Sequence, residues 1–399
     1  REGGFEPRFE ESLGILPVDG ELRLVVGNEG LGYSRVSPVK PEADLYQGFS
    51  LLGQPRDRAP RLGPVLARAG LGRTARVGLV GWKTFTPREA EDPQRPFDVP
   101  HWIVEALRTY SETLINATGL FVHPETGLRA VCEFEQLLAC EWHATRLSRG
   151  VRRLLDALEP GMTEFEAAAR LGYEGHPLSC HLMLCTGDRA GLGMGSPTGK
   201  RIEAGDAMNL AVGVLGTLAC RAGYVAAGPG GKVPADYVDQ VVSPYLGAVA
   251  AWYSGLGVGR PAREAHDAAL TALEGTGIRL LLNPGHLIGY DEWVSTPFMP
   301  GTACVLRSGQ ALQSDLIPVP PAGYYGSNAE DTLCLADAAL RARWAKEAPE
   351  SWGRIQARRR LMADLGYRLA EDVLPFSNLA GAVRPFLLDR TRVMRVGEP

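Results

Sequence analysis

Three side chains in the last third of the chain could together carry acid/base or metal chemistry. His286 lies in the glycine-flanked sequence Gly-His-Leu-Ile-Gly, Asp315 lies late in an apolar strand-like segment, and Glu330 opens the next such segment. An imidazole and two carboxylates held by neighbouring strands can converge as metal ligands or as a general acid and base. We therefore take His286, Asp315 and Glu330 as the candidate catalytic residues.

Each of these residues also has a purely structural interpretation. On its tight turn, His286 could simply hydrogen-bond the neighbouring backbone. A buried carboxylate requires a partner, and an arginine such as Arg189 or Arg221 would satisfy Asp315 or Glu330 without any catalysis. The sequence leaves both interpretations open.

The order of these residues and their flanking sequence resemble the second half of a creatinase/aminopeptidase domain. This is the pita-bread fold of methionine aminopeptidase, the proline-specific peptidases and creatinase. In that family a Gly-His-x-x-Gly histidine precedes a Glu near a Pro-rich strand end and then a Glu-Asp-Thr in a closing strand. Here these positions match His286, Asp315 (in place of the Glu) and Glu330-Asp331-Thr332.

Two earlier segments extend the resemblance toward the N-terminus. Pro160-Gly161-Met162-Thr163-Glu164 lies between two predicted helices, and Thr163 with Glu166 forms a capping box at the start of the second helix. Gly205-Asp206 precedes a strand that ends at Gly213. The match therefore runs from about residue 133 to residue 337 and implies a pita-bread domain.

The resemblance also implies that two metal ligands are missing. Metal-dependent members hold two divalent ions with five side chains, and aligning Gly205-Asp206 with the family puts the first hairpin aspartate at Ala211 and the second at about Ala222. A methyl group cannot coordinate a metal, and hard divalent ions need the charge and the ligands that two aspartates supply. We therefore expect no metal ligands of the usual set and no cofactor; a divalent ion held by other residues is the alternative.

Strand alternation predicts which side chains surround these positions. Residues two apart on a strand lie on the same face. Asn209 should therefore share the face of Ala211, and Cys220 and Tyr224 should share the face of Ala222.

His181 follows Cys180 in an earlier strand and could also point into the cleft. Cys220 could act as a nucleophile with His286, although a buried thiol is the ordinary role of such a cysteine. The candidate substrate-binding residues are Asn209, Cys220, Tyr224 and His181.

Composition limits the class of protein. The chain has 399 residues, 45% of them hydrophobic and 22% charged, which suits a globular protein of two domains. A net charge of −4 argues against a nucleic-acid partner. The longest apolar stretch, from Ala207 to Cys220, is too short to span a bilayer, so we expect no membrane partner. Seven cysteines without a paired spacing, and no visible secretory signal, favour a cytoplasmic protein.

The order of predicted elements gives the domain organisation. Residues 1–125 read as an α/β unit that resembles the N-terminal domain of creatinase and the proline peptidases. Residues 133–340 would form the pita-bread domain, and residues 341–399 a helical extension packed on it. In that extension we expect a helix from Arg354 to Asp364 that packs through Ile355, Leu361 and Met362 and keeps its arginines solvated. The predicted fold class is α+β.

The resemblance implies two candidate functions. The first is a hydrolase that cleaves a C–N bond of a small molecule or short peptide without the usual metal pair, as creatinase does with a histidine and carboxylates. The second is an inactive descendant that serves as a ligand-binding or protein-interaction module. A lyase that uses the same pocket is a further alternative. Two-domain relatives also imply a homodimer.

Overall fold

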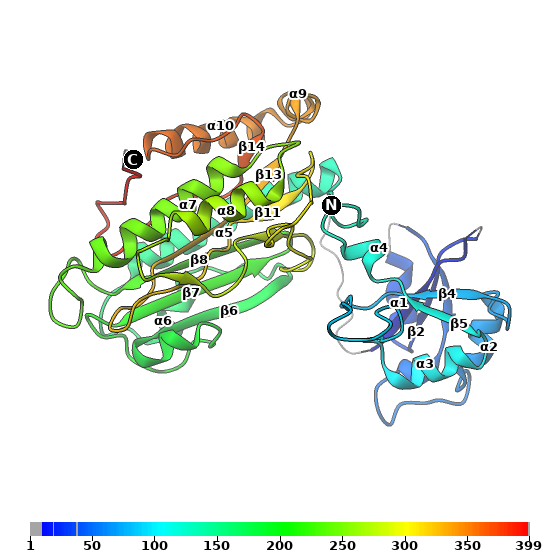
Figure 1. Ribbon diagram of the computed structural model, residues 1–399. Helices are drawn as coiled ribbons and strands as arrows, with labels where there is room; N and C mark the ends of the chain where they lie inside the picture. The colour runs from blue at the N-terminus through cyan, green and yellow to red at the C-terminus, as the bar shows by residue number, and fades with distance from the viewer. Residues whose placement is uncertain (1–9, 19, 37–38, 398–399) are drawn as a thin grey trace. The chain divides into compact units, whose positions relative to one another are not determined.

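The computed structural model describes residues 10–18, 20–36 and 39–397, and the chain divides into two units, Arg1–Phe121 and Val122–Pro399 (Figure 1). The first unit contains strands and short helices in alternation. Its strands form a three-stranded sheet in the order β1-β2-β3 and a parallel pair, β4-β5. The strands are β1 (Ser12–Ile15), β2 (Arg23–Val26), β3 (Glu42–Leu45), β4 (Arg76–Leu79) and β5 (Thr113–Asn116), and the helices are α1 (Gly30–Tyr33), α2 (Leu62–Arg68), α3 (His101–Arg108) and α4 (Gly119–Val122).

The helices of the first unit form where the sequence has apolar residues at helical spacing. In α3, Ile103, Val104 and Leu107 are buried, and they pack with Leu66 of α2 and Val25 of β2 in one core cluster. Burial of these side chains stabilises a unit whose individual helices are too short to be stable alone.

The second unit is organised around a seven-stranded sheet. Its order is β10-β11-β13-β8-β7-β6, with β14 paired to β13, and all of these pairs are antiparallel. A separate two-stranded pair joins β9 to β12. The strands are β6 (Leu178–Thr186), β7 (Ala207–Val214), β8 (Thr217–Tyr224), β9 (Arg279–Leu280), β10 (His286–Leu287), β11 (Ala311–Gln313), β12 (Pro318–Val319), β13 (Asn328–Leu335) and β14 (Val373–Pro375).

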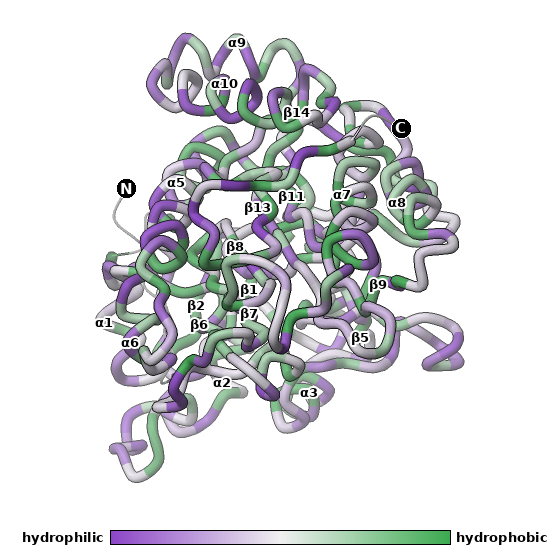
Figure 2. The backbone as a smooth tube through the Cα atoms, turned by 90° about the vertical axis from the view of Figure 1, so that its left-hand side faces the viewer, coloured by the Kyte–Doolittle hydropathy of each residue, from purple (hydrophilic) through white to green (hydrophobic). Residues whose placement is uncertain are grey.

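Helices cover one face of this sheet, and Figure 1 shows α5, α7 and α8 lying along it. Leu147, Val151 and Leu154 of α5 pack on Leu210 and Val212 of β7. Helix α7 is apolar on all sides, as expected of a helix buried between other elements. In Figure 2, α9 and α10 alternate hydrophilic and hydrophobic stretches, as helices with one solvated side do. The helices are α5 (Phe134–Ala157), α6 (Glu164–Ala169), α7 (Ser243–Gly255), α8 (Ala262–Thr271), α9 (Ala338–Glu347) and α10 (Pro349–Asp364).

The capping box predicted for α6 is confirmed. The Thr163 hydroxyl accepts a hydrogen bond from the Glu166 backbone N–H at 3.1 Å, and the Glu166 carboxylate accepts one from the Thr163 N–H at 2.7 Å. None of the helices within the described part of the chain is both long and apolar enough to cross a membrane. The second unit combines an antiparallel sheet with covering helices, as the predicted α+β class requires.

The β7–β8 hairpin and β13 place the candidate residues on one face of the sheet. Asn209 lies opposite Ala222, and Ala211 lies opposite Cys220. On the other side of β8, Cys220 lies opposite Glu330. Because side chains alternate along a strand, these five residues share a face and their immediate neighbours point to the helices.

A buried ion pair occupies the helix-covered face at the same level. Arg221 Nη2 contacts both carboxylate oxygens of Asp331, at 3.0 and 2.8 Å, and donates a further hydrogen bond to the Leu379 carbonyl at 2.7 Å. Arg221 is 4% and Asp331 is 1% exposed. Arg221 therefore faces away from Ala222, as the alternation of side chains along β8 requires.

The C-terminal helices are attached to α5 by charge as well as by apolar packing. Glu141 of α5, which is fully buried, pairs with Arg354 at 2.6 Å and with Arg358 at 2.7 Å. Burial opposes ionisation of Glu141, but the hydrogen bonds from Arg354 and Arg358 lower its pKa. Two expectations for this helix were wrong: Arg358 is buried because it faces Glu141, and Leu361 is exposed, so that Ile355 and Met362 make the apolar contact.

We expect Glu141→Ala to reduce the free energy of unfolding by about 3–5 kcal/mol, because it leaves Arg358 buried without a counter-charge. Urea denaturation would measure the loss. A matched control on the same helix is Glu135→Ala, which breaks a surface pair with Arg343 and should cost about 0–1 kcal/mol. Equal effects of the two substitutions would contradict this account.

Candidate functional site

His286 is the centre of the candidate site. It pairs with Gln313 at the edge of the sheet and is fully buried. Its Nδ1 lies 3.1 Å from the Leu287 carbonyl oxygen, and its Nε2 lies 3.3 Å from Glu292 Oε1 and 3.8 Å from Asp315 Oδ2. The imidazole therefore lies between a backbone carbonyl on one side and two carboxylates on the other.

These partners fix where the ring carries its proton. A carbonyl oxygen only accepts hydrogen bonds, so Nδ1 must be the N–H donor to Leu287. Nε2 then needs either a proton of its own or a protonated carboxyl group opposite it. Within the described residues, neither His286 Nε2 nor Asp315 Oδ1 has a hydrogen-bond partner, although both atoms are buried. Such atoms in a native fold call for a functional explanation or a bound group.

Asp315 and Glu330 form the acidic part of the site. Burial raises the pKa of Asp315, and it raises the pKa of Glu330 well above its ordinary value with a further contribution from the Asp315 charge. Asn328 Nδ2 donates to Glu330 Oε1 at 2.7 Å, which opposes that rise only in part. Two buried carboxyl groups that interact as Asp315 and Glu330 do cannot both ionise near neutral pH, so the pair retains a proton.

The structural alternative for these carboxylates was wrong. Arg221 pairs with Asp331, and Arg189 pairs with Glu164. Among the described residues, Asp315 and Glu330 form no ion pair with arginine or lysine. Asp315 lies beside His286, and Glu330 lies beside Asn328 and forms no ion pair of its own within the described part of the chain, an arrangement suited to acid/base chemistry.

Two residues of the site were not among those that we predicted from the sequence. Glu292 is the carboxylate nearest to His286 and keeps about a quarter of its side chain exposed. Trp293 stacks on the imidazole with ring centroids 4.2 Å apart and planes 24° apart. Both lie in an irregular loop, where no strand or helix period indicates direction. Their only signal was closeness in sequence to the Gly-His-Leu-Ile-Gly turn.

The predicted substrate-binding residues divide into two groups. Asn209 and Cys220 lie together beside the carboxylates: Asn328 Nδ2 donates to Cys220 Sγ at 3.4 Å, and Cys220 Sγ lies 3.7 Å from Asn209 Oδ1. Asn209 also donates to the Gly193 carbonyl at 2.5 Å. Burial and the Glu330 charge raise the pKa of Cys220 well above its ordinary value, so a thiolate nucleophile is disfavoured.

The other two lie outside this cluster. Tyr224 is at the end of β8, where its hydroxyl accepts a hydrogen bond from the Tyr325 N–H at 3.1 Å and its ring packs on Tyr237. His181 is exposed, and its Nε2 lies 3.0 Å from the Met194 carbonyl oxygen. Irregularities in the β6–β7 pairing on either side of Cys180 interrupt the alternation that would direct His181 inward.

Comparison with known proteins identifies the domain that carries this site. Residues 143–337 match the family model of metallopeptidase family M24. These residues form an M24 domain. Comparison with curated proteins finds no significant match.

Solved structures share the fold of this chain. One is dipeptidase PepE from Mycobacterium ulcerans, with a TM-score of 0.62 and 18% identity over 83% of this chain and 84% of that one. Another is an Xaa-Pro dipeptidase from Bacillus anthracis, with a TM-score of 0.61 and 16% identity over 82% and 85%. A third is a prolidase from Pyrococcus furiosus, with a TM-score of 0.58 and 16% identity over 79% of this chain and 85% of that one. At such identities the likeness shows the fold alone.

The M24 family normally uses divalent metal ions, and the residues of this site do not fit that ligand set. Ala211 packs in a small apolar cluster with Met183 and Cys220, and Ala222 lies between Asn209 and Asn328 on the neighbouring strands. These side chains present methyl, thioether, thiol and amide groups where hard ions require carboxylates. In the described part of the chain, no group of three or more His, Cys, Asp and Glu side chains is arranged to hold a metal ion.

The raised pKa of Glu330 predicts a distinct pH dependence of stability. The folded protein keeps a proton that the unfolded chain releases above about pH 4.3. The stability contributed by this group is therefore complete below that pH and is lost as the pH rises through the folded-state pKa. Glu330→Gln should flatten this decline and be more stable than the unsubstituted protein at pH 8 by about 1–3 kcal/mol. Denaturant titrations from pH 4 to 8 would measure it; parallel curves for the two proteins would refute the assignment.

Proposed function

We propose that this M24 protein is a hydrolase that cleaves a C–N bond of a small substrate by acid/base catalysis, without the usual metal pair. The observation that carries the proposal is the buried Nε2 of His286, which faces Glu292 and Asp315 and has no hydrogen-bond partner within the described residues. A site that holds an unsatisfied imidazole nitrogen and a shared carboxyl proton suits proton transfer to and from a bound substrate.

The roles follow from exposure and charge. Glu292 is partly exposed, so it would accept the proton of an attacking water. The water oxygen forms a bond to the carbonyl or amidine carbon, the C–N bond breaks, and the leaving nitrogen takes a proton from the His286–Asp315 pair. Glu330 would keep that pair protonated by sharing a proton with Asp315. Asn209 and Cys220 would bound the substrate on the side of the hairpin.

The site narrows the class of substrate that we propose. The site is buried and the carboxyl groups hold a proton, which favours a small polar substrate such as an amide, an amidine or an Xaa-Pro-like dipeptide. The solved relatives described as Xaa-Pro dipeptidase and prolidase support a short-peptide substrate. We also propose a cytoplasmic homodimer, which rests on composition and on the resemblance to two-domain family members.

A second candidate is an M24 domain that binds a ligand or a protein and does not turn it over. Trp293 stacked on His286 supports it, because the ring covers one face of the imidazole. The apolar packing of Ala211 with Met183 and Cys220 supports it as well. A binding module would keep affinity for its ligand after the acid/base groups are removed.

Steady-state kinetics separates the two candidates. With a panel of Xaa-Pro dipeptides, small amides and amidines, His286→Ala and Glu292→Gln should each lower kcat/KM by about 100-fold or more. Glu274→Gln, an exposed residue on the end of the helical layer, is the matched control and should change nothing.

Two outcomes would overturn the proposal that this protein is a hydrolase. Turnover that is unchanged in both variants would show that these residues are not catalytic. Binding of a panel compound, measured by calorimetry, with no turnover by the unsubstituted protein would leave the binding module as the function.

A further inference from the structure

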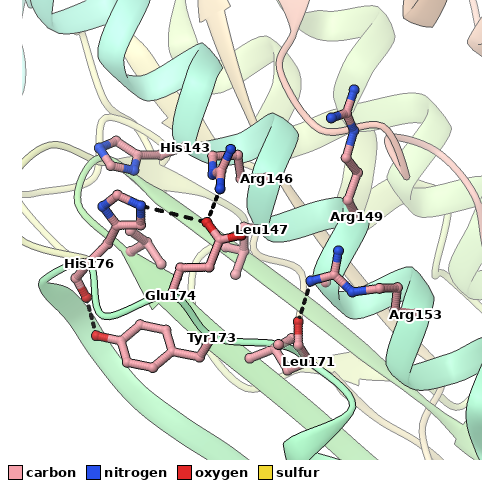
Figure 3. A pocket seen from close by; sticks show the side chains of 12 residues that line it. His143, Arg146, Leu147, Arg149, Arg153, Leu171, Tyr173, Glu174 and His176 are labelled. Atoms are coloured by element: carbon pink, nitrogen blue, oxygen red, sulfur yellow. Dashed lines mark hydrogen bonds and ion pairs between the residues drawn. The ribbon is translucent and has the colours of Figure 1, made fainter.

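A second pocket lies on the outer side of the second unit, away from the candidate site. It has a volume of about 140 Å³ and lies between α5 and the segment that follows α6 (Figure 3). Helix α5 packs through Leu147, Val151 and Leu154 on the sheet face opposite to Asn209 and Ala211. The pocket is therefore separated from His286 by the sheet itself. Its lining residues with charged or aromatic groups are His143, Arg146, Arg149, Arg153, Tyr173, Glu174 and His176.

Arginines dominate the charge of this pocket. Arg146, Arg149 and Arg153 follow the i, i+3, i+7 spacing that puts three side chains in one stripe along a helix. Glu174 is the one carboxylate among the lining residues, all of which belong to the described part of the chain. The pocket therefore has a surplus of positive charge, although the whole chain has a net charge of −4.

The three arginines differ in their hydrogen-bond and ion-pair partners. Arg146 pairs with Glu174 and lies over the Trp142 ring at 4.7 Å. Arg153 Nη2 donates to the Leu171 carbonyl at 2.7 Å, and Arg153 forms no ion pair with any residue that the structure describes. Arg149 has neither a hydrogen bond nor an ion pair among the described residues, and in Figure 3 no dashed line joins it to another lining residue.

The spacing of Arg149 and Arg153 has an energetic consequence. Like charges at positions i and i+4 of a helix repel one another and destabilise it slightly. In Figure 3 the Arg149 side chain points away from Arg153, so a ligand would have to turn this exposed arginine toward the pocket. An anion bound by both guanidinium groups would then remove that repulsion and gain charge-assisted, bidentate hydrogen bonds. A ligand with two negative charges would therefore neutralise the positive charges of Arg149 and Arg153.

Two histidines and a tyrosine complete the lining: His143 from α5, and Tyr173 and His176 from the segment that follows α6. His143 and His176 pack edge to face with ring centroids 5.2 Å apart. Burial lowers the pKa of His143 to about 4, and the nearby His176 and Arg146 contribute to this. A neutral His143 offers a ring N–H donor at pH 7 and adds no repulsion. The Tyr173 ring is half exposed, and its hydroxyl donates a hydrogen bond to the His176 carbonyl (Figure 3).

We propose that this pocket binds the phosphate group of a small phosphorylated molecule, with Arg149 and Arg153 as the main ligands and Arg146 and His143 beside them. A phosphate dianion matches two guanidinium groups better than a single carboxylate does. The site is independent of the hydrolase chemistry proposed for His286, since it lies across the sheet and shares no residue with it.

Calorimetry and histidine NMR on the full chain would test this site. The probes are inorganic phosphate, adenosine monophosphate and citrate at constant ionic strength. We expect saturable binding of the two phosphate probes, weak or no binding of citrate, and a rise in the pKa of His143 when phosphate is bound. Arg149→Gln and Arg153→Gln should each weaken phosphate binding about tenfold.

Arg152→Gln is the matched control. Arg152 lies on the same helix, is exposed, and pairs with Asp156 at 3.2 Å, outside the stripe. Its substitution should leave binding unchanged, and because Arg149 has no partner among the described residues, Arg149→Gln should leave the melting temperature unchanged. No saturable binding of either phosphate probe would overturn the proposal, as would citrate binding as tightly as phosphate. An equal loss of affinity in Arg152→Gln and Arg149→Gln would also overturn it.

Discussion

The buried ion pair between Arg221 and Asp331 is the constraint on which the site depends. It joins β8 to β13 across the helix-covered face, and its hydrogen bond to Leu379 extends it to the C-terminal segment. A slip of one residue would bury one of these charges on the opposite face without its partner, at a cost of several kcal/mol. The register that the pair favours also sets Cys220 opposite Glu330.

The chemistry of the other face follows from this division of charge. Since Arg221 neutralises Asp331, the acidic residues next to His286 have no arginine or lysine partner among the described residues. In a buried site, unpaired carboxylates keep protons, and the histidine between Leu287 and these carboxylates is positioned to exchange one. In the mechanism proposed above, protons would take the electrostatic role that divalent ions serve in metal-dependent relatives. The alanines at positions 211 and 222 are compatible with that role because they add no further negative charge.

The sequence predicted those parts of the site in which side chains follow the two-residue period of a strand. Asn209, Cys220 and Glu330 share a face because strand side chains alternate, and Arg221 points away for the same reason. Glu292 and Trp293 lie in a loop, whose residues follow no period, and the irregular pairing around Cys180 means that alternation does not fix the direction of His181. The Glu141–Arg358 contact joins residues 217 positions apart, and no local pattern indicates such a pairing.

Elemental analysis of protein purified without chelator, expressed as ions per chain, tests the central claim most directly. If protons have taken over the role of the metal pair, manganese, cobalt, zinc and iron should each be far below one ion per chain, and EDTA should leave the melting temperature unchanged. One or two bound ions per chain, with stability lost in EDTA, would contradict the account. In that case His286, Asp315 and Glu330 would be metal ligands completed by groups other than the two alanines.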